Sequence, residues 1–341
     1  MSASIDKKLF GEGFFGHVKR NVKVGLMAER FAVPPFSILD TTAGQWKSRK
    51  AAWLALGLKG EEGRREDTNN DATGIAYRKT LDGFGKELRN KYKLKEMGLA
   101  NDHIDETPTG TSVFDPVLCE LVYRWFTKPG WSVLDPFAGG STRGIVAATL
   151  GRRYHGVEVR SLQVAANTEQ AKLLQIEPSV CKWTVGDSKH ISSLVPDEAD
   201  LLFSCPPYYD REVYSSDTRD GSTHPTYDEF IIWLEDIFNQ SLSRLKRDRF
   251  AAIVVGEIRN QKTGEYRNFV ADTIKIFMDA GLAYWNECVI VTSRGSLSLR
   301  TNRPFCQTRK IGKAHQNLLV FYKGDLANMR ETFEVPVGEI E

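Results

Sequence analysis

The sequence lacks the features of several protein classes. Its 341 residues include only five cysteines, at positions 119, 181, 205, 288 and 306, an odd number without close pairs. This spacing argues against a disulfide framework and against a zinc site, and it favours a reducing compartment. No apolar run approaches the ~18 residues that span a membrane, and the first eight residues lack the apolar segment of a signal peptide. We therefore expect a cytoplasmic protein without a metal site.

A strong excess of either charge is also missing. The chain has 46 Lys and Arg against 44 Asp and Glu, a net charge of +2. Any affinity for nucleic acid must therefore come from local basic patches. With 41% apolar and 26% charged residues the composition is that of a globular protein.

Residues 1–105 are mixed in character, and we interpret them as an α-rich N-terminal extension. A helix is predicted over Gln45–Gly57, with Trp46 and Trp53 on one side. The stretch Arg78–Lys95 carries seven Lys and Arg together with two aromatic rings. Such a stretch suits a phosphate backbone, so this extension is a candidate DNA-binding region, although a solvated helix face fits equally well.

Residues 106–325 alternate regularly between apolar strands and amphipathic helices. We expect strands at 131–134, 154–159, 182–185, 201–203 and 250–255, and helices at 116–126, 141–150, 161–174, 226–245 and 268–280. Two last strands, 284–292 and 317–323, have no helix between them and must pair antiparallel. The pattern predicts an α/β fold with a doubly wound, mostly parallel seven-stranded sheet. Residues 326–341 form a short tail.

The segment Ala199–Tyr209 is an apolar strand that ends in Ser204-Cys205-Pro206-Pro207. The prolines cannot donate hydrogen bonds within a sheet, so they end the strand and stiffen the next residues. Ligands of open α/β sheets bind at this edge. Cys205 and the ring of Tyr208 would lie on this ledge (residues 204–209), although an ordinary proline-terminated strand explains the segment equally well on its own.

Polar groups also follow three earlier strands. Val133–Gly144 contains a glycine-rich turn in which Gly139 allows close approach of a ligand to the backbone. Glu158 follows about twenty residues later, the spacing at which a carboxylate holds a nucleotide ribose. Asp187 ends the next strand, where a carboxylate can accept a hydrogen bond from an adenine amine. Together they predict a nucleotide site.

The motifs Asp135-Pro-Phe-Ala-Gly-Gly-Ser and Cys205-Pro-Pro-Tyr208, with Glu158 and Asp187, resemble the S-adenosylmethionine-dependent DNA methyltransferases. Among these enzymes the resemblance is to those that methylate exocyclic amines, N4 of cytosine or N6 of adenine. It covers about residues 110–325 and implies a class I, Rossmann-like methyltransferase fold. A dinucleotide-binding domain is the alternative, but the turn lacks the G-x-G-x-x-G of that class.

The resemblance implies a cofactor, S-adenosylmethionine, and a set of residues that hold it. The glycine turn would contact its methionine part, Glu158 its ribose and Asp187 its adenine, and the segment around Phe114 would close over it. The implied cofactor contacts are Phe114, Asp135, Phe137, Gly139, Glu158 and Asp187. The segment His315–Gly324 resembles the last strand of the family.

Cys205 departs from this family, which has Asp, Asn or Ser before the two prolines. In the family that residue accepts hydrogen bonds from the target amine. A thiol is a weak acceptor, so the Pro206 carbonyl, or Ser204 one residue earlier, would have to serve here. Catalytic positions under this hypothesis are Cys205, Pro206, Pro207 and Tyr208.

A thiolate is, however, a good nucleophile. Methylation of cytosine at carbon 5 requires a nucleophile that adds to carbon 6 and an acid near N3. Cys205 and Glu257, which ends the fifth apolar strand, are on adjacent strand ends and could take these roles. Cytosine-5 methyltransferases carry their cysteine after the proline, so the similarity is one of roles only.

DNA is the expected partner, with the target base flipped out of the duplex and stacked on Tyr208, and Tyr209 as a second candidate for stacking. The loop Asp210–His224 could surround this base. A second loop, 294–313, is a candidate DNA-binding segment because it is rich in basic residues: Arg294, Arg300, Arg303, Arg309, Lys310 and Lys313. A solvated charged loop is the alternative interpretation. An RNA substrate, or a DNA-binding module without catalysis, remains open.

Overall fold

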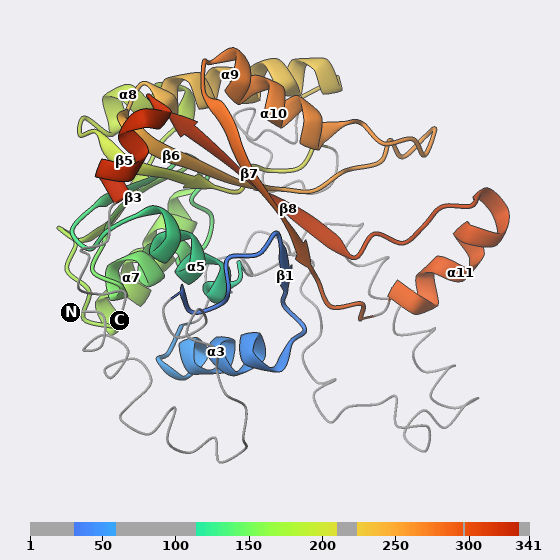
Figure 1. Ribbon diagram of the computed structural model, residues 1–341, viewed down its shortest axis with the longest axis horizontal. Coiled ribbons are helices and arrows are strands. Elements are labelled where there is room, and N and C mark those ends of the chain that lie inside the picture. The colour runs from blue at the N-terminus through green and yellow to red at the C-terminus, as the bar shows by residue number, and fades with distance from the viewer. Residues whose placement is uncertain (1–30, 59–113, 210–223, 296, 334–341) are drawn as a thin grey trace.

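The computed structural model describes residues 31–58, 114–209, 224–295 and 297–333. They form one eight-stranded sheet between two layers of helices (Figure 1). The strands are β1 (Ile38–Asp40), β2 (Ser132–Asp135), β3 (Arg153–Glu158), β4 (Cys181–Val185), β5 (Ala199–Ser204), β6 (Leu245–Val255), β7 (Ala283–Val291) and β8 (His315–Lys323).

The strand order is β1-β7-β8-β6-β5-β2-β3-β4. All neighbours pair parallel except β8, which is antiparallel to both β6 and β7. The order reverses at β2: β3 and β4 lie on one side of it, β5 and β6 on the other. Such a switch point opens a crevice for ligands at the carboxyl ends of the strands. The predicted doubly wound, mostly parallel, Rossmann-like sheet with an antiparallel last pair is confirmed.

Helices of one layer cover the face that contains Val133, Phe203 and Val254, and helices of the other cover Leu134, Leu202 and Ile253. The central strands are buried on both faces, which explains their continuous apolar runs. The first layer comprises α3 (Gly44–Ala55), α5 (Pro116–Phe126), α6 (Thr142–Thr149) and α7 (Ser161–Leu173); the second comprises α8 (Ile191–Leu194), α9 (Tyr227–Leu242) and α10 (Phe269–Asp279).

Local signals fix where these helices begin. Asp115 caps α5 by accepting a hydrogen bond from the Val117 amide at 2.9 Å, and Pro116 occupies the first turn. Thr226 and Glu229 form a capping box at the start of α9. In the part of the chain that the structure describes, no helix is both long and apolar enough to cross a membrane.

Two described elements that bear on the site were not predicted from the sequence. β1 adds an eighth strand by pairing parallel with β7, so residues 38–40 of the N-terminal region belong to the sheet. The expected loop 294–313 contains helix α11 (Leu297–Thr308), which has no buried residue and a proline, Pro304, in its interior. It lacked the apolar periodicity by which a helix is recognised. The basic stretch Arg78–Lys95 lies outside the described residues.

A buried cluster of charged side chains joins α3 to α5. Glu120 of α5 pairs with Arg49 of α3 and, at 2.9 Å, with Arg124, and it accepts the Trp53 indole N–H at 2.9 Å. Burial acts to raise the pKa of Glu120, but Arg49 and Arg124 lower it below its usual value. The cluster therefore holds an ionised carboxylate where α3 meets α5.

We predict that Glu120→Ala lowers the free energy of unfolding by about 3–5 kcal/mol, because it leaves the Arg49 guanidinium buried without its partner. Urea denaturation followed by circular dichroism measures this. Glu169→Ala, which breaks only an exposed pair with Lys172, serves as control and should cost less than about 1 kcal/mol. Equal losses in the two variants would contradict the buried-pair interpretation.

Candidate active site

Five parallel strands bring their carboxyl ends to one edge of the sheet. The registers Asp135↔Gly156 and Glu158↔Val185 align the ends of β2, β3 and β4, and Ser204↔Ile253 aligns β5 with β6. The antiparallel β8 begins at the same edge, since Val255 pairs with Asn317. The glycine turn, Glu158, Asp187, the Cys205 ledge and Glu257 therefore share one edge, as the sequence predicted.

Asp135 is the centre of a buried hydrogen-bond network. Its carboxylate accepts four hydrogen bonds: from the Phe137 amide (3.1 Å), Arg143 Nε (2.5 Å), the Tyr154 hydroxyl (2.7 Å) and Ser204 Oγ (2.6 Å). The side chain is fully buried. In this structure Asp135, which we predicted as a direct cofactor contact, therefore joins the glycine turn to the end of β5.

Arg143 completes this network from the first turn of α6. It donates to the carbonyl oxygens of Phe137 (2.5 Å) and Ala138 (3.0 Å), and its guanidinium lies 4.6 Å from the centroid of the Phe114 ring. Burial lowers the pKa of Arg143, but Asp135, Tyr154 and the nearby Cys205 raise it above its ordinary value. A permanent positive charge is thus held beneath the turn and close to Cys205.

The glycine turn is held from its other side by β3 and α7. The Gly139 amide donates to Glu158 Oε2 at 2.9 Å, and the Gly139 carbonyl accepts from Asn167 Nδ2 at 2.7 Å. Gly139 has a φ of 50°, a left-handed conformation that favours glycine. Glu158 also accepts from the Arg160 amide at 3.0 Å, so its carboxylate sits where the turn and the end of β3 meet.

Asp187 caps the short helix η2 (Ser188–His190) through the Lys189 amide at 2.9 Å. Ser188 Oγ donates to the Pro136 carbonyl at 2.5 Å, which ties this strand end to the glycine turn. Phe137 packs against Trp233 and Phe238 of α9, with ring centroids 5.6 and 5.8 Å apart. The turn therefore contacts both helix layers.

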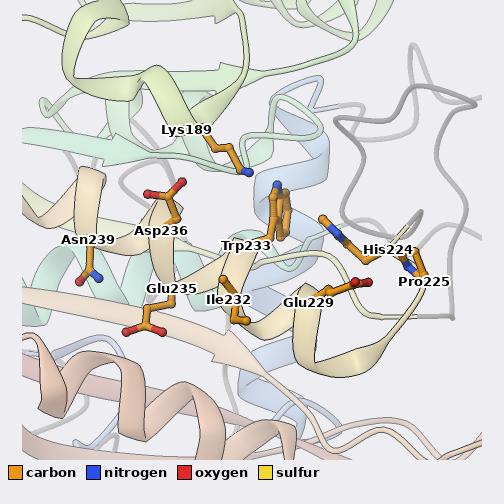
Figure 2. Close-up of a pocket in the computed structure, with 9 residues that line it drawn as sticks. All are labelled: Lys189, His224, Pro225, Glu229, Ile232, Trp233, Glu235, Asp236 and Asn239. Carbon is orange, nitrogen blue, oxygen red and sulfur yellow. The ribbon is translucent and has the colours of Figure 1, made fainter.

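An open groove of about 610 Å³ lies between η2, which Asp187 caps, and α9 (Figure 2). Lys189 points toward the Trp233 ring from one side, and His224 approaches that ring from the other. Carboxylates make up much of the remaining wall, which consists of Pro225, Glu229, Ile232, Glu235, Asp236 and Asn239. The groove combines an aromatic floor with hydrogen-bond acceptors, as the binding of a purine ring with an exocyclic amine requires.

The ledge presents Cys205, Pro207 and Tyr208, each half-buried, whereas Ser204, Pro206 and Tyr209 are buried. Cys205 is half-buried, whereas Ser204 is fully buried behind it. Ser204 therefore cannot replace the missing Asp, Asn or Ser as acceptor of a target amine. The Tyr208 hydroxyl accepts a hydrogen bond from Gln316 Nε2 at 2.9 Å, and its ring packs edge-on against Phe269.

Tyr209, the second candidate for stacking on a base, is buried. Its hydroxyl donates to the Pro225 carbonyl at 3.2 Å, and its ring lies beneath the Arg267 guanidinium at 4.7 Å. The rings of Tyr227 and Phe230 pack around it. Tyr209 therefore supports the ledge, and only Tyr208 remains as a candidate for stacking.

Glu257 caps α10. Its two carboxylate oxygens accept the backbone N–H groups of Phe269 (3.2 Å) and Val270 (3.0 Å). An anion at a helix N-terminus is favoured by the unsatisfied amides and by the helix dipole. The sequence could not indicate this, because the contact depends on how residues 258–268 fold. In this structure Glu257 therefore makes a capping contact, and its role as an acid near a base stays a prediction.

The basic residues of the second loop lie on an arm that projects from the sheet. Arg294, Arg300, Arg303 and Arg309 are exposed on or beside α11, and Lys310 and Lys313 are half-buried nearer the sheet. Helix α11 stands clear of the sheet at the end where β7 and β8 meet the arm (Figure 1). In the loop Asp210–His224, only His224 lies within the described residues.

Several residues of the site escaped the sequence analysis, namely Arg143, Tyr154, Trp233 and Gln316. Arg143 could have been noticed in the sequence, because it is a charged residue among small and apolar residues in the helix that follows the glycine turn. The others come from elements distant in sequence. Among the residues that the structure describes, no group of three or more His, Cys, Asp or Glu side chains could hold a metal ion.

No protein-family model matches the chain, and no curated protein matches its sequence. Solved structures resemble part of it. TrmN from Thermus thermophilus is 18% identical with a TM-score of 0.41, and the match covers 62% of this chain and 49% of TrmN. The chain thus spans about half the length of that protein.

Two further structures match at similar levels. A precorrin-6y C5,15-methyltransferase from Geobacter metallireducens is 12% identical with a TM-score of 0.40, covering 65% of this chain and 95% of its own. Magnesium protoporphyrin IX methyltransferase from Synechocystis, with bound S-adenosylmethionine, is 12% identical with a TM-score of 0.41, covering 71% and 96%. Identities and scores this low transfer neither an activity nor a substrate to this chain.

We predict that Glu257→Ala lowers the free energy of unfolding by about 1.5–3 kcal/mol, because two amides lose a charged acceptor. Glu257→Gln should recover part of the loss, since one amide oxygen can still accept. Urea denaturation measures both, and Glu265→Ala, an exposed carboxylate on the neighbouring hairpin, is the control. An Ala variant as stable as this control would contradict the capping role.

Proposed function

We propose that the protein is an S-adenosylmethionine-dependent methyltransferase that modifies the exocyclic amine of a DNA base, N4 of cytosine or N6 of adenine. The observation that carries the proposal is the shared edge of β2, β3, β4 and β5. This edge places the glycine turn, two carboxylates and the proline-stiffened ledge beside one another at the switch point of the sheet.

The residues present fit the cofactor. Glu158 and Asp187 end adjacent strands, and carboxylates can accept hydrogen bonds from ribose hydroxyls and an adenine amine. Phe137 and Trp233 provide apolar surface, and the glycine turn provides backbone that a ligand can approach. S-adenosylmethionine, when bound, supplies a methyl group carried on a sulfonium. The Asp135–Arg143 pair would act indirectly, by holding the turn in shape.

Methyl transfer needs positioning more than acid–base chemistry, so the ledge would act by orienting the target amine. The half-buried Cys205 thiol is the weak acceptor that the ledge presents to an amine N–H, whereas Pro206, the other candidate, is buried. Tyr208, held by Gln316, would stack on a flipped base.

DNA as the substrate is supported by the arm. Residues 288–324 include Arg294, Arg300, Arg303, Arg309, Lys310 and Lys313 and contain no Asp or Glu. The arm leaves the sheet beside the ledge, between β7 and β8. A strongly basic arm next to a base-sized ledge suits the phosphate backbone of the strand that carries the target base.

Carbon-5 methylation of cytosine is the second candidate, and Cys205 is the observation that favours it. The half-buried thiol lies near the buried Arg143 guanidinium, and a cysteine is the kind of nucleophile that this reaction requires. The required acid is less well supported, because both oxygens of Glu257 accept hydrogen bonds from α10. Amine methylation needs no such acid and is therefore preferred.

The decisive experiment identifies the product. The protein is incubated with isotope-labelled S-adenosylmethionine and duplex DNA, the DNA is digested, and the labelled nucleoside is identified by mass and retention. We expect N4-methylcytosine or N6-methyladenine. 5-Methylcytosine would favour the carbon-5 reaction, label in RNA alone would contradict the DNA substrate, and binding without any transfer would indicate a non-catalytic module.

A Cys205→Ser variant separates the two chemistries at one atom. Under the amine proposal the hydroxyl is a better acceptor than the thiol, so we expect the rate of transfer to be retained or raised. Under the carbon-5 alternative the nucleophile is lost, and transfer should fall by several orders of magnitude. Single-turnover rates with saturating cofactor provide the measurement, and circular dichroism checks that the variant is folded.

A further inference from the structure

The segment between β6 and α10 forms a closed hairpin, residues 258–267. The Arg267 amide donates to the Ile258 carbonyl and the Asn260 amide to the Glu265 carbonyl, both at 2.9 Å, and Arg259 pairs with Tyr266 as antiparallel partners. At its tip, Asn260 Oδ1 accepts the Lys262 amide at 2.9 Å. These bonds define the shape of the hairpin without any partner.

Tyr266 stands on this hairpin as an exposed aromatic ring among cations. The ring is 48% exposed. The Arg259 guanidinium lies 3.9 Å from its centroid and the Lys313 ammonium 6.0 Å. The hydroxyl-bearing ring is therefore held in place by its neighbours while much of its surface remains open, an arrangement suited to contact with a base or sugar.

The hairpin and the basic arm contact each other. The Lys310 side chain lies against Gly264, where an added Cβ would collide with its Nζ and Cε. Lys313 lies near Arg259 and Glu257: burial lowers the pKa of Lys313, Glu257 opposes this and Arg259 adds to it. Both segments project from the same end of the sheet (Figure 1). Together they form one surface, which we call the clamp (residues 258–267, 292–295 and 297–314).

The base of the hairpin is fixed to the ledge. Glu257 joins the residue before the hairpin to Phe269 and Val270 just after it. Arg267 lies over the rings of Tyr209 and Tyr227, at 4.7 and 5.3 Å. The clamp is therefore positioned relative to Tyr208 and Cys205 by direct contacts on the ledge.

We propose that the clamp holds duplex DNA beside the flipped base, with Lys262, Lys310 and the arm arginines on the phosphates and Tyr266 against the neighbouring nucleotide. The positive charge of the clamp is the reason for proposing DNA as its ligand. The hairpin has three Lys and Arg against one Glu, and residues 288–324 have no acidic residue. A polyanion with aromatic faces fits such a surface. The inference rests on the proposed DNA methyltransferase function.

Fluorescence anisotropy with labelled duplex DNA, at several salt concentrations, tests the clamp without requiring catalysis. Tyr266→Ala should weaken binding about tenfold, as expected for the loss of one stacking contact, whereas Tyr266→Phe should bind like the original protein. Lys262→Glu and Lys310→Glu should each weaken binding several-fold and reduce the salt slope by about 1 or more.

Lys172→Glu, an exposed charge reversal on α7, is the matched control and should leave binding unchanged apart from the small effect of net charge. Calorimetric titration with S-adenosylmethionine confirms that each variant retains its cofactor site. Should Lys310→Glu fail to fold, Lys262→Glu at the exposed hairpin tip gives the same test.

The outcomes separate the clamp from the proposed function. If DNA binding falls as expected but the original protein transfers no methyl group to DNA, the clamp stands and the proposed reaction is wrong. If transfer occurs and the clamp variants bind and react like Lys172→Glu, the clamp alone is wrong. Binding to RNA in preference to duplex DNA, or no binding to DNA, overturns the clamp as a DNA surface.

Discussion

Asp135 and Arg143 form a buried ion pair at the point where the two halves of the sheet meet. The pair ties together the glycine turn, Tyr154 of β3 and Ser204 of β5. A buried charge without its partner typically costs about 3–5 kcal/mol, so the network has one low-energy arrangement. That arrangement fixes the position of the glycine turn relative to the ledge, and the geometry of the site depends on it.

The register of β5 decides which side chains the ledge presents. Side chains alternate along a strand, and Ser204 points to the buried Asp135 while Cys205, the next residue, lies half-buried at the edge. The hydroxyl that could have received a target amine is thereby used in the core. The half-buried thiol of Cys205 remains at the edge, and residue 205 therefore separates the two candidate reactions.

Elements with continuous apolar runs or clear punctuation could be predicted from the sequence. β2, β5 and β6, the glycine turn and the proline-stiffened ledge all lie close to their expected positions, because their signals are local. β1 is three residues long and gains its stability from pairing with β7. Helix α11 has no buried residues, so its sequence lacks the apolar periodicity that predicts a helix. The capping contact of Glu257 joins residues on either side of a hairpin, so only the folded chain reveals it.

β6 links the chemistry of the ledge to the surface that we assign to DNA. The strand is buried at the centre of the sheet, and its continuation passes through Gly256 beside Tyr208 and through Glu257 at the cap of α10 before it enters the hairpin. A displacement of the hairpin would therefore strain the Glu257 cap and the Arg267–Tyr209 contact together. Because Tyr209 adjoins Tyr208, a nucleotide bound at Tyr266 and a base stacked at Tyr208 would be held by one connected set of side chains. On this argument Glu257 would contribute to the proposed reaction by aligning the DNA, without donating a proton.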